Sequence, residues 1–257
     1  FHPSLRFESI AKRLDDSAKS NNVSIVGCGI NPGFSFDSLV LLLGRITTHV
    51  TSVTVRRVTD VTGTGLGDID HVGFGFDPED FEKKISTGRL VGHMGMPESI
   101  AAVAERFGIQ INRIEESWKT QLNTDPVESG SERGVIEPGR VIGILQRGTG
   151  FLDQKEIINM HLNMFYEPTR YGHKEADEII LKGSHNIHAS LTPSAVSIQG
   201  AGLMIVNATH DIIQAPDGLC NVLDLSIGGR RRGGRGAEVR RTGVRGAAAN
   251  TVDADGI

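Results

Sequence analysis

Three groups of residues in this sequence have types and spacings that could do chemistry. The first follows an apolar run at 23–26 and reads Gly27-Cys28-Gly29-Ile30-Asn31-Pro32-Gly33-Phe34. It predicts a buried strand, a glycine-rich turn and then a helix, and open α/β sheets bind ligands beyond the carboxyl ends of such strands. Gly33 would let the backbone approach a ligand, and the Asn31 amide could bond to the edge of a flat polar ring. A tight turn without any ligand explains the same residues equally well.

This turn does not match the pyrophosphate-binding motif of dinucleotide enzymes. The motif G-x-G-x-x-G begins correctly at Gly27 and Gly29, but Pro32 stands where the third glycine is required. No acidic residue ends a second strand about 20 residues later, where it would bind a ribose hydroxyl. The turn is therefore not expected to hold phosphates.

The second group is Gly92-His93-Met94-Gly95-Met96-Pro97-Glu98-Ser99. His93 lies just before the N-terminus of a predicted helix, where free backbone N–H groups favour anions. A histidine there could donate, accept or shuttle a proton near neutral pH. The alternative is that His93 is an exposed loop residue and that Glu98 only complements the helix dipole.

The third group, Arg56, Arg57 and Asp60, lies at the end of a predicted strand that faces a glycine-rich loop. Arginine binds carboxylates bidentately, so Arg57 could hold an amino-acid-like substrate; an ordinary surface ion pair is the alternative. His185 and His188 are three residues apart on a predicted strand and so face opposite sides. They predict no metal site, and no metal is expected.

Helices and strands that alternate in the first half of the chain must position these groups. Helical signals cover 4–20, 35–43 with Gly44 as the stop, 77–88 with Asp77 as the N-cap, and 97–107 closed by Gly108. Strands are expected at 23–26 and 53–58. From 109 to 191 the apolar period changes to two, which favours consecutive antiparallel strands with one wetted face. A last helix is expected at about 195–214.

Composition excludes several classes of protein. The 257 residues carry a net charge of −4, which favours neither nucleic acid nor membrane surfaces. Two cysteines make no disulfide framework and suit the cytoplasm. No apolar run is long enough to span a bilayer. Residues 228–257 contain seven arginines and many glycines without apolar periodicity, so a disordered tail is expected; nonspecific RNA binding is a weaker alternative.

The order of these motifs resembles the 2,4-diaminopentanoate dehydrogenase-like family, which is related to dihydrodipicolinate reductase. The resemblance covers about 23–225. It rests on the Gly29-to-Phe34 turn with Asp37, the strand that ends at Asp60, and the block from Gly92 to Ser99. Further matching blocks are Pro78-Glu79-x-Phe81, Val206-Asn207-Ala208, and Ala215-Pro216-x-Gly218-Leu219 through Asp224-Leu225.

The resemblance implies an NAD(P)-dependent oxidoreductase that acts on the amine or imine carbon of an amino-acid-like small molecule. It implies an α/β fold: a remnant of a Rossmann-type dinucleotide-binding domain at 1–45, an α+β substrate-binding and homo-oligomerisation domain at 46–227, and the tail at 228–257. Most of the dinucleotide-binding domain is expected to lie outside this chain. A non-catalytic oligomerisation or ligand-binding domain is the alternative.

The resemblance also implies roles for the candidate residues. Gly29, Asn31, Pro32, Gly33 and Phe34 would bind NAD or NADP near the nicotinamide ring. The substrate side would be formed by Arg57, Asp60, His93 and Glu98. His93 is the candidate for the proton in catalysis, and Asn31 is the candidate for positioning the reactants.

Overall fold

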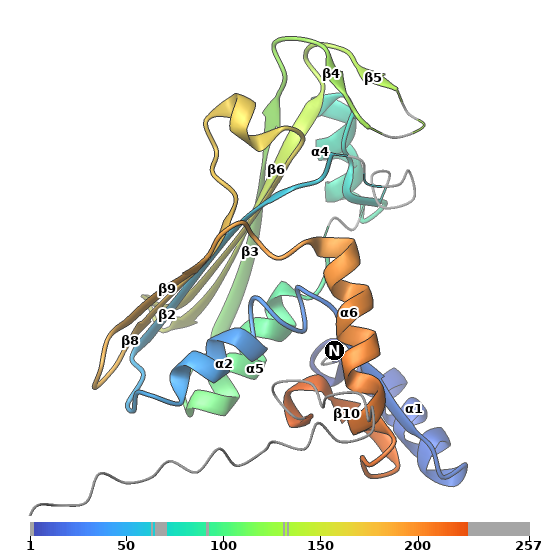
Figure 1. Cartoon of the computed structure of the whole chain (residues 1–257), viewed down its shortest axis with the longest axis vertical. Helices are drawn as coiled ribbons and strands as arrows, with labels where there is room; N and C mark the ends of the chain where they lie inside the picture. The colour runs from blue at the N-terminus through green and yellow to red at the C-terminus, as the bar shows by residue number, and fades with distance from the viewer. Residues whose placement is uncertain are drawn as a thin grey trace, which may run out of the picture.

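The largest sheet in the described part of the chain has six strands, with helices on one side of it (Figure 1). The computed structural model describes residues 3–62, 64, 71–90, 93–130, 132 and 134–225. In spatial order the strands are β3 (Arg113–Leu122), β6 (Val141–Leu152), β7 (Lys155–Phe165), β2 (Ser52–Asp60), β8 (Ala176–Lys182) and β9 (Ile187–Leu191). Within this sheet β2 and β7 pair in parallel, and the other neighbours are antiparallel. The mixed, mostly antiparallel sheet expected from the sequence is confirmed.

The two faces of the sheet differ in polarity, as the period of two predicts. On β7, Ile158, Met160 and Leu162 are fully buried, whereas Asn159 and His161 between them are partly exposed. Side chains of successive strand residues point to opposite faces, so one face packs into the core and the other is open to water. The cavity described below lies on the buried side.

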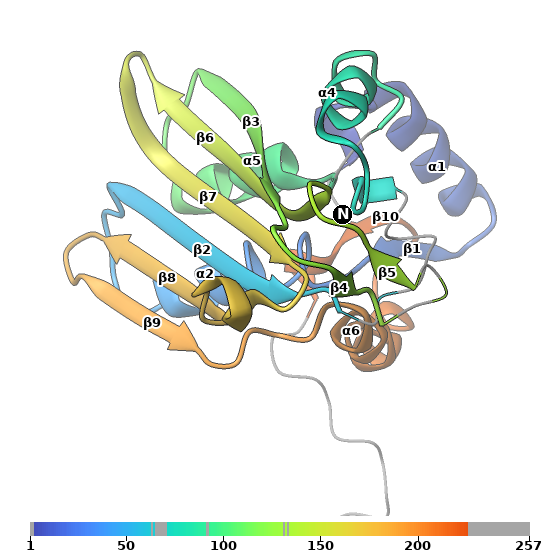
Figure 2. The same ribbon diagram turned by 90° about the horizontal axis from the view of Figure 1, so that it is seen from above.

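Two helices cover the buried face, α2 (Ser38–Gly44) and α5 (Met96–Phe107) (Figure 2). Gly148 on β6 permits the contact, because a Cβ there would lie 2.6 Å from Sδ of Met96. Gly44 was expected to follow the first of these helices as a stop signal. It is instead the last helical residue, and a Cβ there would lie 2.3 Å from the Phe107 ring, so it allows α2 to pack against α5.

Helix capping follows the sequence signals closely. Helix α4 (Pro78–Ser86) begins after Asp77, whose side chain accepts a hydrogen bond from the backbone N–H of Glu79 at 3.0 Å. Helix α5 ends at Phe107 and is capped by Gly108, which has a φ of 65°. The left-handed backbone at that position favours glycine and satisfies the last carbonyls of the helix.

A second, smaller sheet joins the two ends of the described chain. Strand β1 (Ser24–Gly27) pairs in parallel with β10 (Gly218–Asn221), flanked by α1 (Glu8–Ser20) and α6 (Ser197–Ile212) (Figure 2). The remaining short elements are η1 (Pro3–Leu5), β4 (Val127–Glu128), β5 (Val135–Ile136), η2 (Pro168–Tyr171) and η3 (Val222–Asp224).

One strand begins later than the sequence predicts, whereas the domain boundaries and the disordered tail stay predictions. The strand expected from Ile109 begins later, at Arg113, because the chain first turns after Gly108. The domain boundaries at 45 and 227 stay predictions, although β10 places residues from 218 onward beside the first segment. The tail at 228–257 lies outside the described residues. Among the helices described, none is long and apolar enough to cross a membrane.

Candidate functional site

A cavity of about 500 Å³ lies where the small sheet meets the large one. The turn after β1 forms one wall through residues 27–32, and Thr59 and Met164 form another. Thr64, His93 and Ser197 add polar groups to the lining, while most of the remaining lining is apolar. A cavity of this size and character is typical of small-molecule sites.

The turn after β1 is held from inside by a buried carboxylate. Both oxygens of Asp37 accept the N–H of Gly33, at 3.0 and 2.9 Å, and Oδ1 also accepts the N–H of Ser38 at 2.8 Å. Gly33 has a φ of 131°, and a Cβ there would lie 2.4 Å from the carbonyl oxygen of Gly29. Complete burial raises the pKa of Asp37 to about 6, against the hydrogen bonds that lower it. Glycine at position 33 therefore serves the turn itself.

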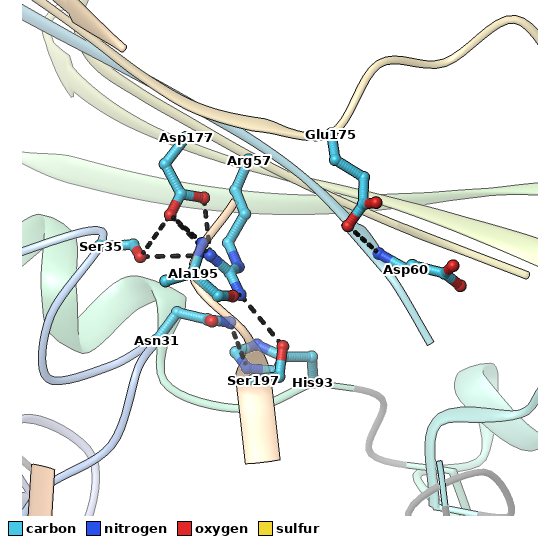
Figure 3. Close-up of polar contacts among 9 residues, drawn as sticks. All are labelled: Asn31, Ser35, Arg57, Asp60, His93, Glu175, Asp177, Ala195 and Ser197. Atoms are coloured by element: carbon cyan, nitrogen blue, oxygen red, sulfur yellow. Dashed lines mark hydrogen bonds and ion pairs between the residues drawn. The ribbon is translucent and has the colours of Figure 1, made fainter. Parts of the chain in front are cut away.

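Three contacts bring this turn to the loop that carries His93. The hydroxyl of Ser99 donates to Oδ2 of Asp37 at 2.8 Å. Gly95, with a φ of 107°, lies against Pro32, because a Cβ at Gly95 would be 2.6 Å from Cδ of the proline. Asn31 then meets His93, with Nδ2 of the amide 2.8 Å from Nε2 of the imidazole. Two motifs that are 62 residues apart in sequence thus form a single polar pair at the cavity (Figure 3).

His93 is less basic than the sequence suggests. Burial lowers its pKa to about 4, with a smaller contribution in the same direction from the positive charge of Arg57. The imidazole is therefore neutral at physiological pH, and its Nδ1 is buried without a hydrogen-bond partner among the described residues. The sequence predicts a proton shuttle near neutral pH on the basis of the ordinary pKa of histidine. The lowered pKa of buried His93 corrects that prediction.

Arg57 does not reach the cavity, because a network inside the protein occupies it. Its Nη1 lies 2.6 Å from Oδ1 of Asp177, and both side chains are fully buried. Its Nη2 donates to the carbonyl of Ala195 and, at 3.0 Å, to the hydroxyl of Ser197 (Figure 3). Ser35 closes the network by donating to Asp177 at 3.0 Å. Arg57 therefore anchors the start of α6, and its contact with the cavity is indirect, through Ser197.

The other predicted residues separate into two groups. Gly29, Asn31, Pro32 and His93 line the cavity. Outside the lining lie Gly33, Phe34, Arg57, Asp60 and Glu98. Asp60 is exposed, and its carboxylate accepts the N–H of Thr62 at 2.7 Å.

The reason for the position of Asp60 is the strand period. Thr59 faces the cavity, so the next residue on β2 must point to the opposite face. Glu98 is buried at the start of α5, with Oε1 3.8 Å from Nη1 of Arg6. The structure therefore places Arg57, Asp60 and Glu98 away from the cavity lining.

Several cavity residues carry no sequence signal of their own. Thr59, Leu162 and Met164 read as ordinary strand residues, and Ser197 reads as the start of a helix. The place of Thr59, Leu162 and Met164 at the cavity follows from β2 and β7 lying side by side in parallel. Such a pairing between distant segments leaves no local pattern in the sequence. Among the described residues, no group of three or more His, Cys, Asp or Glu could hold a metal ion.

Comparisons with known proteins agree with this architecture. The chain is 32% identical over 226 residues to 2,4-diaminopentanoate dehydrogenase of Acetoanaerobium sticklandii, covering 88% of this chain and 64% of the relative. The chain thus spans less than two thirds of that relative. The fold matches the structure of amine dehydrogenase from Mycobacterium smegmatis with a TM-score of 0.79 at 17% identity, covering 90% of this chain and 67% of the other.

A family model gives the assignment directly. Residues 34–233 match the model described as the 2,4-diaminopentanoate dehydrogenase C-terminal domain. The match includes the loop of His93, the whole six-stranded sheet and α6. The chain therefore belongs to the family of 2,4-diaminopentanoate dehydrogenase C-terminal domains.

Proposed function

We propose that this chain forms the substrate side of an NAD(P)-dependent oxidoreductase that acts at a carbon bearing an amine. The observation that carries the proposal is the Asn31–His93 pair at the wall of a largely apolar cavity. Family membership supports it, since the curated relative is a dehydrogenase of a diamino acid. Localisation in the cytoplasm and assembly into a homo-oligomer remain part of the proposal.

The cavity suits the ring end of a nicotinamide cofactor. It opens beyond the carboxyl end of β1, which pairs in parallel with β10, and open parallel sheets bind their ligands at that end. Gly29, Asn31 and Pro32 would lie against the ring, and apolar side chains such as Ile198 and Met164 would exclude water. The amide oxygen of Asn31 accepts no hydrogen bond from the described residues, so it is available to a carboxamide. When bound, the nicotinamide supplies or accepts the hydride.

The remaining chemistry belongs to protein side chains. In the oxidative direction the C–H bond beside nitrogen breaks, its electron pair leaves as hydride, and the nitrogen loses one proton as the imine forms. Neutral His93 would accept a hydrogen bond from the reacting nitrogen at Nε2 and then take its proton there. The substrate would replace the Asn31 amide, which bonds to Nε2 in this structure. An uncharged imidazole would not repel a cationic amine as it binds, which agrees with the lowered pKa of His93. Asn31 would then position both reactants.

The charges in the cavity lining limit which part of a substrate could bind there. Its described lining contains no lysine or arginine, and Arg57 is paired with Asp177. A substrate carboxylate would therefore have to be held by groups outside the described lining. The reacting end of an amino-acid-like substrate would enter the cavity, and its charged end would lie toward the mouth.

The decisive experiment combines binding with turnover. The purified chain is titrated with NADH and with NADPH by fluorescence, and oxidation of 2,4-diaminopentanoate is followed through nicotinamide absorbance. We expect His93→Ala to lower kcat by about 10²-fold, the usual contribution of a positioned proton-transfer group. His185→Ala changes an exposed histidine and is the matched control.

Two results would contradict the proposal. Normal kcat in both the His93→Ala and Asn31→Ala variants would remove these residues from catalysis. Absence of cofactor binding at millimolar concentration would favour the alternative, a non-catalytic ligand-binding or oligomerisation domain.

A further inference from the structure

Two serine hydroxyls contact the same buried guanidinium, that of Arg57, but their surroundings differ (Figure 3). Nη1 of Arg57 donates to Oγ of Ser35 at 3.3 Å, and Nη2 donates to Oγ of Ser197 at 3.0 Å. Ser35 is fully buried, whereas Ser197 is partly exposed and lines the cavity. The two hydroxyls thus share a partner, but of the two it is Ser197 that a ligand in the cavity can contact.

The two hydroxyls also differ in where their hydrogen goes. A guanidinium can only donate, so both serines accept from Arg57 and each keeps one hydrogen to donate. Ser35 gives its hydrogen to Oδ2 of Asp177 at 3.0 Å. Within the described part of the chain, the side chain of Ser197 makes no hydrogen bond except the one that it accepts. The O–H of Ser197 is therefore left for a group in the cavity.

The hydroxyl of Ser197 is held in place before any ligand binds. Both oxygens of Asp177 accept from Nη1 of Arg57, at 2.6 and 2.8 Å, and Nη2 also donates to the carbonyl of Ala195. The N–H of Ala195 in turn donates to Asp177 at 3.0 Å. A donor fixed in this way costs little to order when a ligand binds, and a hydroxyl polarised by a cation donates more strongly.

The charges behind Ser197 favour an uncharged acceptor over an anion. The positive charge of Arg57 is balanced by the carboxylate of Asp177, so little net charge lies behind the hydroxyl. Ile198 and Ala201 of the same helix contribute to the largely apolar lining. A carboxylate placed there would lose its hydration without gaining a cation, whereas a carbonyl oxygen loses less. The acceptor that fits is a neutral carbonyl oxygen, as in a carboxamide.

We propose that Ser197 is a ligand-binding residue whose hydroxyl donates a hydrogen bond to the oxygen of a carboxamide in the cavity. In the enzyme proposed above, that group is the carboxamide of the nicotinamide ring, for whose N–H groups the amide oxygen of Asn31 in the same cavity is available. The identity of this ligand rests on the proposed function, whereas the free donor of Ser197 follows from the contacts of Arg57.

The test compares two probes on the ¹⁵N-labelled full chain, in the absence of substrate and dinucleotide. Free nicotinamide is titrated against thionicotinamide, whose sulfur is a weak acceptor, and binding is followed through backbone amide signals of residues that line the cavity. We expect wild type to prefer nicotinamide, and Ser197→Ala to bind it about 3- to 10-fold more weakly, the usual effect of one neutral hydrogen bond. The affinity of Ser197→Ala for thionicotinamide should change little. Ser197→Thr keeps the hydroxyl and should keep the preference.

The other serine on Arg57 provides the matched control. Ser35→Ala should lower the free energy of unfolding, because it opens the buried network, but it should keep the wild-type preference between the two probes. The proposal is overturned if wild type binds both probes equally or binds no nicotinamide, or if Ser35→Ala loses the preference as Ser197→Ala does. If Ser197→Ala does not fold, wild type and Ser197→Thr decide through the same preference. Nicotinamide binding without turnover would uphold the role of Ser197 and contradict only the proposed function.

Discussion

At the scale of single residues, the site depends on buried groups whose pKa values differ from those in water. His93 has a pKa lowered to about 4, and Asp37 has a pKa raised to about 6, and burial is the largest cause in each case. Both shifts favour the neutral form. The polar pair at the cavity wall is consequently uncharged near neutral pH, where a charged imidazole would repel a cationic substrate.

The His93 shift predicts a dependence of stability on pH. The unfolded chain binds a proton at His93 near pH 6.5, whereas the folded chain binds it only near pH 4. The unfolded state therefore holds more protons between these values, so the free energy of unfolding should rise with pH across this window. Replacing His93 with an uncharged residue should reduce the rise in the free energy of unfolding between pH 4 and 6.5 by on the order of 2 kcal/mol.

Urea unfolding of wild type and His93→Gln at half-unit steps of pH measures this difference directly. The wild-type curve should be the steeper of the two over the window. Parallel curves would show that His93 titrates in the folded protein as it does in water. Asp37 contributes with the opposite sign, because its raised pKa stabilises the fold as the pH falls from 6 toward 4, but it is present in both proteins and cancels.

At the scale of elements, the site depends on two loops that pack directly against each other because a glycine stands at their contact. The turn after β1 and the loop before α5 meet at Pro32 and Gly95, and the hydrogen bond of Ser99 to Asp37 fastens the start of α5 to the same turn. The Asn31–His93 pair follows from this contact. Any side chain at position 95 would separate the two loops.

Gly95→Ala should therefore cost both stability and activity. The new Cβ would lie 2.6 Å from Cδ of Pro32, on a backbone with a φ of 107°. We expect a loss of about 2 to 4 kcal/mol in the free energy of unfolding, from strain and overpacking together. Gly108→Ala is the matched control, because Gly108 has a φ of 65° but nothing within 4 Å of the added atom.

Urea unfolding and kcat of the two variants separate contact from backbone strain. Gly108→Ala should lose only about 1 kcal/mol and keep the geometry of His93. Equal losses of stability in the two variants, with kcat retained in both, would refute the role of the Pro32–Gly95 contact.

At the scale of the whole molecule, one buried ion pair joins segments that are distant in sequence. Arg57 on β2 and Asp177 on β8 connect the central sheet to Ser35 before α2 and to Ala195 and Ser197 at the start of α6. The wall of the cavity formed by α6 therefore takes its position from the sheet. The neighbouring Arg56 makes only a surface pair with Glu178, at 3.0 Å.

Replacing these two adjacent arginines should have very different effects. Arg57→Leu leaves Asp177 buried without its partner, and breaking such a pair costs about 3 to 5 kcal/mol. Arg56→Leu removes an exposed pair worth at most about 1 kcal/mol. The free energy of unfolding of both variants, measured in urea at pH 7, makes the comparison. Similar values for the two would contradict the assignment of Arg57 as the anchor of α6.

The sequence by itself determined the helix ends and the alternation along strands, because these depend on residues that are close together in the chain. Asp77 and Gly108 mark helix ends through their own backbone preferences, and the alternation along β7 follows from the geometry of one strand. The motifs at Asn31 and His93 were also visible, because their glycines and prolines constrain a few neighbouring residues. These features need no information from distant parts of the chain.

Only the tertiary structure decided which of these residues act together. The roles of Arg57 and Asp60 depend on which face of β2 meets the helices and on the presence of Asp177, which is 120 residues away from Arg57. The pKa of His93 depends on its burial, which no single segment specifies. Desolvation and hydrogen bonding act through space, so the sequence named the candidate residues while packing assigned their chemistry.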